Sequence, residues 1–270
     1  VGAGPAGLAA AEELRRRGYR VTVYDRHDRA GGLLIYGIPN FKLEKDVVAR
    51  RVKRLEDGGI VFKLNFEMGR DASLEELRAS HDALFIATGV YKPREIEVPG
   101  VRLGRVVEAL DFLIASNRKG LGDKVANAPD AKGKHVAVIG GGDTAMDCVR
   151  TAMRQGAKSV SCIYRRDRDN MPGSLREVAN AEEEGITFEW LTLPRAFLGQ
   201  KNVEGVRLSR MRLGLPDASG RKSPEEIRDA DFTLDADLVI KALGFDAETM
   251  PQELETTRWG TLKTQASMTN

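Results

Sequence analysis

The stretch "HVAVIGGGDTAMDCVRTAMRQGAKSVSCIYRR", residues 135–166, decides the fold. An apolar run typical of a strand leads into a glycine turn, an amphipathic helix follows, and a second apolar run closes the stretch. Gly140, Gly142 and Ala145 have the spacing G-x-G-x-x-A, which brings backbone amides and a helix N-terminus close to a pyrophosphate. We therefore predict a strand–helix–strand unit that binds a dinucleotide.

The second apolar run ends in Arg165 and Arg166, where such units usually carry an acid. Guanidinium groups hold a 2′-phosphate that a carboxylate would repel, so the pattern favours NADP over NAD. The alternative is a solvated charge cluster that also includes Asp167, Arg168 and Asp169. The strand–helix–strand context favours the phosphate site.

A similar unit begins the chain, in "VGAGPAGLAAAEELRRRGYRVTVYDR". Gly2, Gly4 and Gly7 form G-x-G-x-x-G, and Asp25 follows about twenty residues later, where a carboxylate can accept hydrogen bonds from a ribose. This unit suits a dinucleotide with a free 2′-hydroxyl. Two such units predict an α/β protein with two Rossmann-like domains and two dinucleotides.

Composition sets limits on the partners. The 270 residues are 41% hydrophobic and 30% charged, enough for two domains with proper cores. Since 42 Lys and Arg nearly balance 40 Asp and Glu, no overall field favours nucleic acid or an anionic membrane. The longest apolar runs, "DALFIATGV" and "ADLVIKALG", are shorter than the roughly 18 residues of a membrane span and are predicted to be buried strands. We expect neither nucleic acid nor membrane as a partner.

The cysteines and histidines do not indicate a metal or redox site. Cys148 falls in a predicted helix and Cys162 in a predicted strand, and we interpret both as small core residues. His27, His81 and His135 stand singly, without the spacing of metal ligands. We predict no metal site and no catalytic side chain.

Domain limits follow from the polar linker at residues 118–134. We predict a first domain over residues 1–120, to which residues 246–270 return, and a second over 121–245. An amphipathic helix ends near Leu55, with Arg50, Lys53 and Arg54 on its solvated face, opposite an apolar side formed by Val47, Val48, Val52 and Leu55. Val1 lies inside a motif whose first strand should precede it, and "TLKTQASMTN" adds no closing element, so we expect a piece cut at both ends.

The order of motifs resembles that of the two-dinucleotide flavoproteins, and within them the glutamate synthase small (β) subunits. The motifs are "GAGPAGL", "AGGLLIYGIPNFKLEK", "ATGVYKPREIEVPG", "VVEALDFL", "VIGGGDTAMDCVRTAMRQGAKSV", "YRRDRDNMPGSLREVANAEEEGI" and "ADLVIKALGF". The resemblance implies FAD on the first domain and NADPH on the second, with the NADPH domain inserted into the FAD domain. The FAD positions that match are Gly2, Gly4, Pro5, Ala6, Gly7, Asp25, Gly31, Gly32, Leu33, Thr88 and Gly89. The NADPH positions that match are Gly140, Gly142, Asp143, Thr144, Ala145, Arg165 and Arg166.

The resemblance also implies a function. A cytoplasmic NADPH-dependent oxidoreductase would pass hydride from NADPH to FAD, and electrons would continue singly through iron-sulfur clusters to a large subunit. That partner makes glutamate from glutamine and 2-oxoglutarate. The clusters belong to an N-terminal domain with clustered cysteines, which this sequence lacks, and the chain stops before the expected terminal Gly-Asp segment.

Other interpretations share the same modules. They are the flavin module of a dihydropyrimidine dehydrogenase, an NADPH:ferredoxin-type oxidoreductase, and a truncated fragment that binds nucleotide without turnover. A disulfide reductase would need a redox cysteine pair, which neither expected region contains. Glu177 lies in a family motif, but Ser174 three residues earlier would also make a plain capping box.

Overall fold

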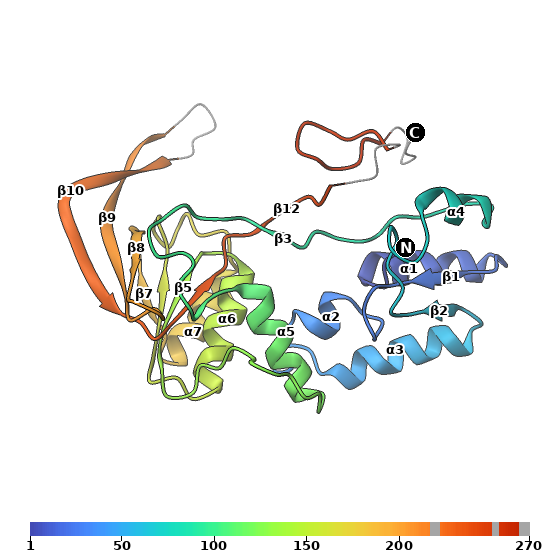
Figure 1. Ribbon diagram of the computed structural model, residues 1–270, viewed down its shortest axis with the longest axis horizontal. Coiled ribbons are helices and arrows are strands. Elements are labelled where there is room, and N and C mark those ends of the chain that lie inside the picture. Colours follow the sequence, from blue (N-terminus) through green and yellow to red (C-terminus); the bar gives the residue numbers. More distant parts are fainter. Residues whose placement is uncertain (217–221, 250–253, 265–270) are drawn as a thin grey trace. The chain divides into compact units, whose positions relative to one another are not determined.

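The computed structural model describes residues 1–216, 222–249 and 254–264 (Figure 1). The chain divides into two compact units. The first unit comprises Val1–Lys92, Gly120–Gly122 and Phe245–Asn270, and the second comprises Pro93–Lys119 and Asp123–Gly244. The second unit is therefore inserted between two stretches of the first, as the fold prediction states. Residues 265–270 of the predicted polar C-terminal stretch lie outside the described residues.

Helices and strands alternate through most of the described chain. The helices are α1 (Pro5–Arg16), α2 (Leu33–Tyr36), α3 (Lys45–Asp57), α4 (Leu74–Ala79), α5 (Ala109–Gly120), α6 (Asp143–Arg154) and α7 (Leu175–Glu183). The strands are β1 (Thr22–Tyr24), β2 (Val61–Lys63), β3 (Lys92–Pro93), β4 (Val106–Glu108), β5 (His135–Ile139), β6 (Ser159–Ile163), β7 (Thr187–Glu189), β8 (Thr192–Leu198), β9 (Gly205–Pro216), β10 (Lys222–Asp235), β11 (Leu238–Lys241) and β12 (Phe245–Asp246). Within the described ranges, no helix has the length and apolar character needed to cross a membrane.

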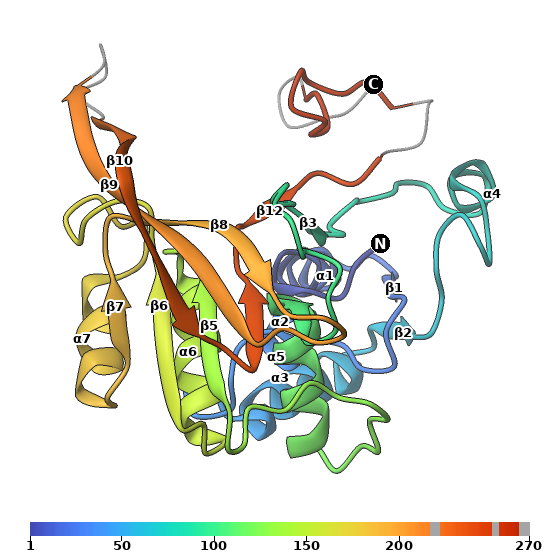
Figure 2. The same cartoon turned by 60° about the vertical axis from the view of Figure 1, so that its left-hand side comes forward.

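The second unit is built on a five-stranded parallel sheet with the order β4-β11-β5-β6-β7, of which Figure 2 labels β5, β6 and β7. The chain runs from β5 through α6 to β6, and from β6 through α7 to β7, while β11 pairs with the other edge of β5. The strand order therefore changes direction at β5. In open parallel sheets, nucleotides bind at the carboxyl ends of the strands beside such a switch point.

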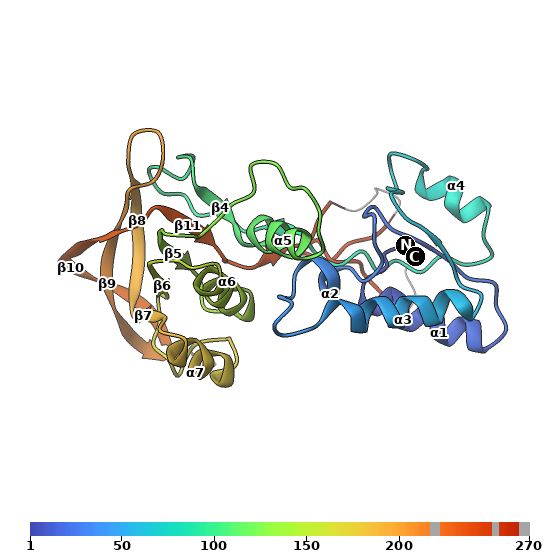
Figure 3. The ribbon, with the colours of Figure 1, turned by 90° about the horizontal axis from the view of Figure 1, so that it is seen from below.

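Two different layers cover this sheet (Figure 3). Val136 and Val138 of β5 share a core with helices α5, α6 and α7, whereas Ala137 and Ile139 share a core with the antiparallel sheet β8-β9-β10. Because side chains alternate between the faces of a strand, a strand covered on both faces is a continuous apolar run. The runs predicted as β5, β6 and β11 are confirmed.

Cys148 of α6 and Cys162 of β6 are free and buried, which confirms their interpretation as core residues. Burial raises the pKa of the Cys162 thiol to about 12, and that of Cys148 also lies well above its ordinary value, first because of burial and then because of Asp147. Neither thiol is therefore ionised near neutral pH.

The first unit has a smaller sheet, in which β1 pairs in parallel with β2. Leu8 of α1, Val23 of β1 and Leu55 of α3 share its core. The basic face predicted for α3 is exposed, as expected, but Val47, predicted on the apolar side of this helix, is also exposed.

The prediction of a buried strand at "DALFIATGV" is wrong. Residues 82–90 form no strand, and Phe85 is 53% exposed. Only Val1 lies opposite this stretch in the described chain, donating to the carbonyl of Phe85 at 2.6 Å and accepting from the amide of Ala87 at 2.8 Å. A strand needs a longer neighbour to complete its ladder.

The change from the first unit to the second falls at Lys92 and Pro93, earlier than the boundary expected near residue 120. β4 pairs with β11, and Phe112 of α5 is fully buried in the core of the second unit. The stretch 93–119 therefore belongs with the parallel sheet. The chain leaves that sheet at Gly244, close to the predicted limit at residue 245.

Candidate functional site

The first glycine turn is packed too tightly for side chains at two of its three glycines. Gly2 has φ +102°, and a methyl group there would overlap the carbonyl of Ala87, while one on Gly7 would overlap the carbonyl of Gly2. Around Gly4, in contrast, nothing lies within 4 Å of where a methyl group would stand. The back of the turn, at Gly2 and Gly7, is therefore packed against backbone carbonyls. Its front, at Gly4, is open, and α1 begins there.

The predicted glycine pair at Gly31 and Gly32 lies against this turn. The amide of Gly31 donates to the carbonyl of Ala3 at 2.8 Å, and a methyl group on Gly32 would lie 2.8 Å from the Cα of Gly4. Leu33 begins α2 directly afterwards. Both glycines have positive φ, so the close approach needs residues without side chains.

Asp25 follows β1 and is 8% exposed. Its Oδ2 accepts from the amide of Ala3 at 2.7 Å, and its Oδ1 accepts from the amide of His27 at 2.8 Å and lies 2.9 Å from His27 Nδ1. Burial raises the pKa of this carboxyl, but the hydrogen bonds from His27 and Ala3 outweigh burial and hold the pKa below its ordinary value. The carboxylate therefore braces the glycine turn, and Oδ2 keeps an acceptor position for a further donor.

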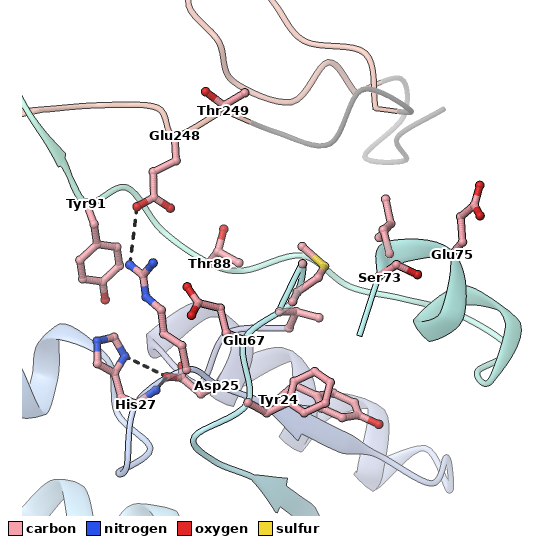
Figure 4. A pocket seen from close by; sticks show the side chains of 17 residues that line it. Tyr24, Asp25, His27, Glu67, Ser73, Glu75, Thr88, Tyr91, Glu248 and Thr249 are labelled. Carbon is pink, nitrogen blue, oxygen red and sulfur yellow. Dashed lines mark hydrogen bonds and ion pairs between the residues drawn. The ribbon is translucent and has the colours of Figure 1, made fainter. Parts of the chain in front are cut away.

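A cavity of about 670 Å³ opens in front of this turn (Figure 4). Three predicted positions, Gly2, Asp25 and Thr88, line it. The predicted residue Gly89 follows Thr88 with φ +71°. Pro5 and Ala6, in the first turn of α1, are exposed. The structure thus brings Gly2, Asp25 and Thr88 to one cavity and places Gly31 and Gly32 against the glycine turn.

Arg26, His27, Tyr91 and Glu248 are among the lining residues that were not predicted. The guanidinium of Arg26 lies 4.8 Å from the ring centroid of Tyr91 and 3.6 Å from Glu248 Oε1. Burial, and then the charge of Asp25, raises the pKa of Tyr91. Arg26 and His27 could have been predicted as cavity residues, because they directly follow Asp25 at the end of a strand. Nothing in the sequence near Asp25 points to Glu248, since it is distant along the chain.

The second glycine turn repeats the first. Gly140 has φ +146°, and a methyl group there would overlap the carbonyl of Ala242, the residue after β11. Gly142 has φ −93° and nothing within 4 Å of a methyl position. The predicted residues Asp143, Thr144 and Ala145 form the first turn of α6. The amide of Ala145 donates to the carbonyl of Gly142 at 2.9 Å, whereas the backbone amides of Asp143 and Thr144 have no partner among the described residues.

Arg165 and Arg166 follow β6, but their environments differ. Arg165 is exposed, whereas Arg166 is 8% exposed and its Nε is buried without a partner. Across residues 1–216, 222–249 and 254–264, nothing forms a hydrogen bond or ion pair with the guanidinium of Arg166. A buried cation without a partner is unfavourable unless a ligand supplies the anion.

The loop that carries these arginines, Tyr164–Ser174, ends at α7. Ser174 is the residue before this helix, but its side chain makes no capping hydrogen bond, and Glu177 instead pairs with Arg150 at 2.7 Å. The interpretation of Ser174 and Glu177 as a capping box is therefore wrong. An ion pair with a neighbouring helix cannot be read from spacing within one helix.

Two glycine turns at strand ends, one followed by a buried acid and the other by a buried arginine, define a two-dinucleotide oxidoreductase fold. The sequence matches the family described as pyridine nucleotide-disulphide oxidoreductase over residues 1–270. The chain belongs to this family.

Relatives support the resemblance seen in the motifs. The chain is 62% identical over 271 residues to the glutamate synthase [NADPH] small chain of Azospirillum brasilense, covering 97% of this chain and 56% of the relative. It is 62% identical over 269 residues to a putative glutamate synthase [NADPH] small chain of Cereibacter sphaeroides, covering 97% and 65%. The recognition of glutamate synthase small subunits is confirmed, and the chain spans between half and two thirds of these relatives.

Among solved structures, FprA of Mycobacterium tuberculosis in complex with NADPH matches with a TM-score of 0.76 and 22% identity. The match covers 94% of this chain and 71% of FprA. At this identity the similarity concerns the fold alone. It agrees with the predicted fold class of two Rossmann-like domains.

Two substitutions can distinguish the packed side of the second glycine turn, at Gly140, from its open side, at Gly142. Gly140→Ala should lower the free energy of unfolding by about 2 kcal/mol or more, because the methyl group overlaps Ala242 and φ is positive. Gly142→Ala should change stability by less than about 0.5 kcal/mol yet weaken dinucleotide binding at least about tenfold, because the methyl group fills the open face. Urea unfolding and nucleotide titration measure the two effects. Unchanged binding by Gly142→Ala would show that the nucleotide lies elsewhere.

Asp25→Asn should destabilise the first unit by about 1–3 kcal/mol at neutral pH, since the amide cannot accept all the hydrogen bonds of the carboxylate. The folded-state pKa of Asp25 is lowered, so its stabilisation is complete above the unfolded value of about 4 and is lost as pH falls through the folded value. Unfolding free energies of both proteins between pH 7 and pH 3, expected to converge at the acid end, test this. A constant difference across that range would contradict it.

Proposed function

We propose that the first unit binds FAD and the second binds NADPH. The observation that carries this proposal is the contrast between the two strand ends: Asp25 stands after β1, and Arg166 stands after β6 without a partner. A carboxylate suits a ribose with free hydroxyls, and a guanidinium suits a 2′-phosphate.

The first unit has the features that FAD requires. Asp25 Oδ2 can accept one ribose hydroxyl in addition to the amide of Ala3. The space in front of Gly4 admits a pyrophosphate close to the backbone, next to the exposed start of α1. Tyr91 and the cation above it, Arg26, offer flat surfaces at the wall of the cavity.

The second unit has the features that NADPH requires. The pyrophosphate would face Gly142 and the first turn of α6, and the 2′-phosphate would supply the missing partner of Arg166. Asp143 does not oppose this, since its Oδ1 accepts from the amide of Ser174 at 3.0 Å and so faces the loop. We therefore propose that Asp143 holds the loop through Ser174 and that Arg166 binds the 2′-phosphate.

When bound, the two cofactors supply hydride transfer from nicotinamide to flavin. The residues of this chain bind and orient them and keep water away, which positioning chemistry of this kind requires. No side chain needs to act as acid, base or nucleophile, in agreement with the absence of a predicted catalytic residue.

In the whole protein we propose the role of the electron-input subunit of a cytoplasmic glutamate synthase. Of two relatives at 62% identity, one is named glutamate synthase [NADPH] small chain and the other putative glutamate synthase [NADPH] small chain. Electrons would pass from FAD through iron-sulfur clusters to a large subunit, where glutamate forms. The alternative is the same flavin module in a dihydropyrimidine dehydrogenase or an NADPH:ferredoxin-type oxidoreductase.

Arg166→Ala should raise the Kd for NADPH about tenfold or more and leave that for NADH within about twofold, because a charge-assisted hydrogen bond contributes about 1.5–3 kcal/mol. Arg165→Ala should have a smaller effect, since its side chain is exposed. Fluorescence titration of wild type, the single variants and the double variant with both nucleotides measures this. Equal affinity of the wild type for NADPH and NADH would refute the assignment.

The full-length protein should reduce an artificial dye with NADPH alone but form glutamate only together with a separate large subunit. A dye accepts electrons directly, whereas glutamate synthesis needs a site for glutamine and 2-oxoglutarate that we do not assign to this chain. Assays with dye, and with both substrates, each with and without the large subunit, test the division. Glutamate formed by the small subunit alone would contradict it, and dihydrouracil formed by the native assembly would favour the alternative.

A further inference from the structure

The arginine loop, Tyr164–Ser174, is attached to the glycine turn at both of its ends. At the first end, the ring of Tyr164 covers Gly141 so closely that a methyl group there would overlap it. At the other end, the amide of Gly173 donates to the carbonyl of Gly141 at 3.0 Å, and the amide of Ser174 donates to Asp143. Between these ends the carbonyl of Arg166 accepts from the amide of Leu191 at 3.0 Å, so the place of Arg166 relative to the open turn depends on this contact as well as on where the loop ends.

The loop ends at α7, and a buried ion network fixes α7 to α6. Arg150 Nη1 donates to Glu177 Oε2 at 2.7 Å, and its Nε and Nη2 donate to Glu184 Oε1 at 2.9 and 2.7 Å. The side chain of Arg150 is 10% exposed and that of Glu177 is 17% exposed. Arg154 adds a contact with Glu184 at 2.8 Å.

This network is not needed to attach the helix. Val178 and Ala181 of α7 are fully buried in the same core as Val149 of α6, so apolar packing already holds the two helices together. Removing charges from water is costly, and buried ion pairs often contribute less stability than apolar residues of similar size. Their best-attested effect is to fix the register of one element against another.

We propose that the ion pair of Arg150 and Glu177 is a positioning device for NADPH selectivity. Glu177 lies in the first turn of α7, directly after the loop, so the pair sets the position of Ser174 and Gly173 on the glycine turn. Through the loop it holds Arg166 where the 2′-phosphate binds. This inference rests on the proposed function, because it concerns the same nucleotide site.

The test measures the Kd for NADPH and NADH and the unfolding temperature of four proteins. They are the wild type, Glu177→Gln, the double variant Arg150→Met with Glu177→Met, and Glu183→Gln. Glu183 is the matched control, because it lies on the same helix, is exposed, and its side chain has no hydrogen bond or ion pair to any residue that the structure describes.

Glu177→Gln should raise the Kd for NADPH about tenfold and that for NADH less than about twofold. The double variant should unfold at or above the temperature of the wild type, since an apolar pair replaces the ion pair, and still lack the preference for NADPH. Glu183→Gln should match the wild type in all three measurements.

Three results would overturn the inference. Equal weakening of NADPH and NADH by Glu177→Gln would indicate a general structural role, as would recovery of NADPH preference in the double variant. An unchanged ratio in Glu177→Gln would show that the loop is held without the pair. A wild type without preference for NADPH would instead refute the proposed function, and with it this inference.

Discussion

The contact between Gly140 and the carbonyl of Ala242 is the constraint on which the second unit depends. It leaves no room for a side chain, so the backbone leaving β5 can turn directly beside the end of β11. This turn aims the N-terminus of α6 at the carboxyl edge of the sheet, with Gly142 open in front. Gly2 and the carbonyl of Ala87 make the equivalent contact in the first unit. In both turns one glycine is required by packing, and another has open space where a side chain would stand.

The two units use the position after their strand in opposite ways. Asp25 makes its hydrogen bonds within the protein and stabilises the turn whether or not a nucleotide is present. The side chain of Arg166 has no partner among the described residues and its Nε is buried, so its partial burial weakens the unit until an anion binds. In the proposed site, pairing with a phosphate would offset this cost of partial desolvation.

The sequence predicted those elements whose pattern of apolar residues or glycines lies within one continuous segment. The apolar runs of β5, β6 and β11, the glycine turns and the acid at Asp25 all follow from spacing along one segment. The errors concern partners from other segments. "DALFIATGV" has the composition of a strand, but among the described residues only Val1 lies opposite it, and Glu177 pairs with Arg150 from another helix. The place of β4 in the parallel sheet, and that of Glu248 in the cavity wall, also depend on residues distant in sequence.

Rigidity of the arginine loop follows from the same energetic argument. A flexible loop would let Arg166 reach water, and the unfavourable burial of its charge would disappear, together with its advantage for binding phosphate. The loop is held by Tyr164 and Gly173 on the glycine turn and by the ion network behind α7. In a preorganised loop, the entropic cost of ordering the residues is met when the unit folds. Nucleotide binding then does not have to offset that cost. In the proposed site, selectivity for a phosphate would therefore depend on the residues that hold the arginine as much as on the arginine itself.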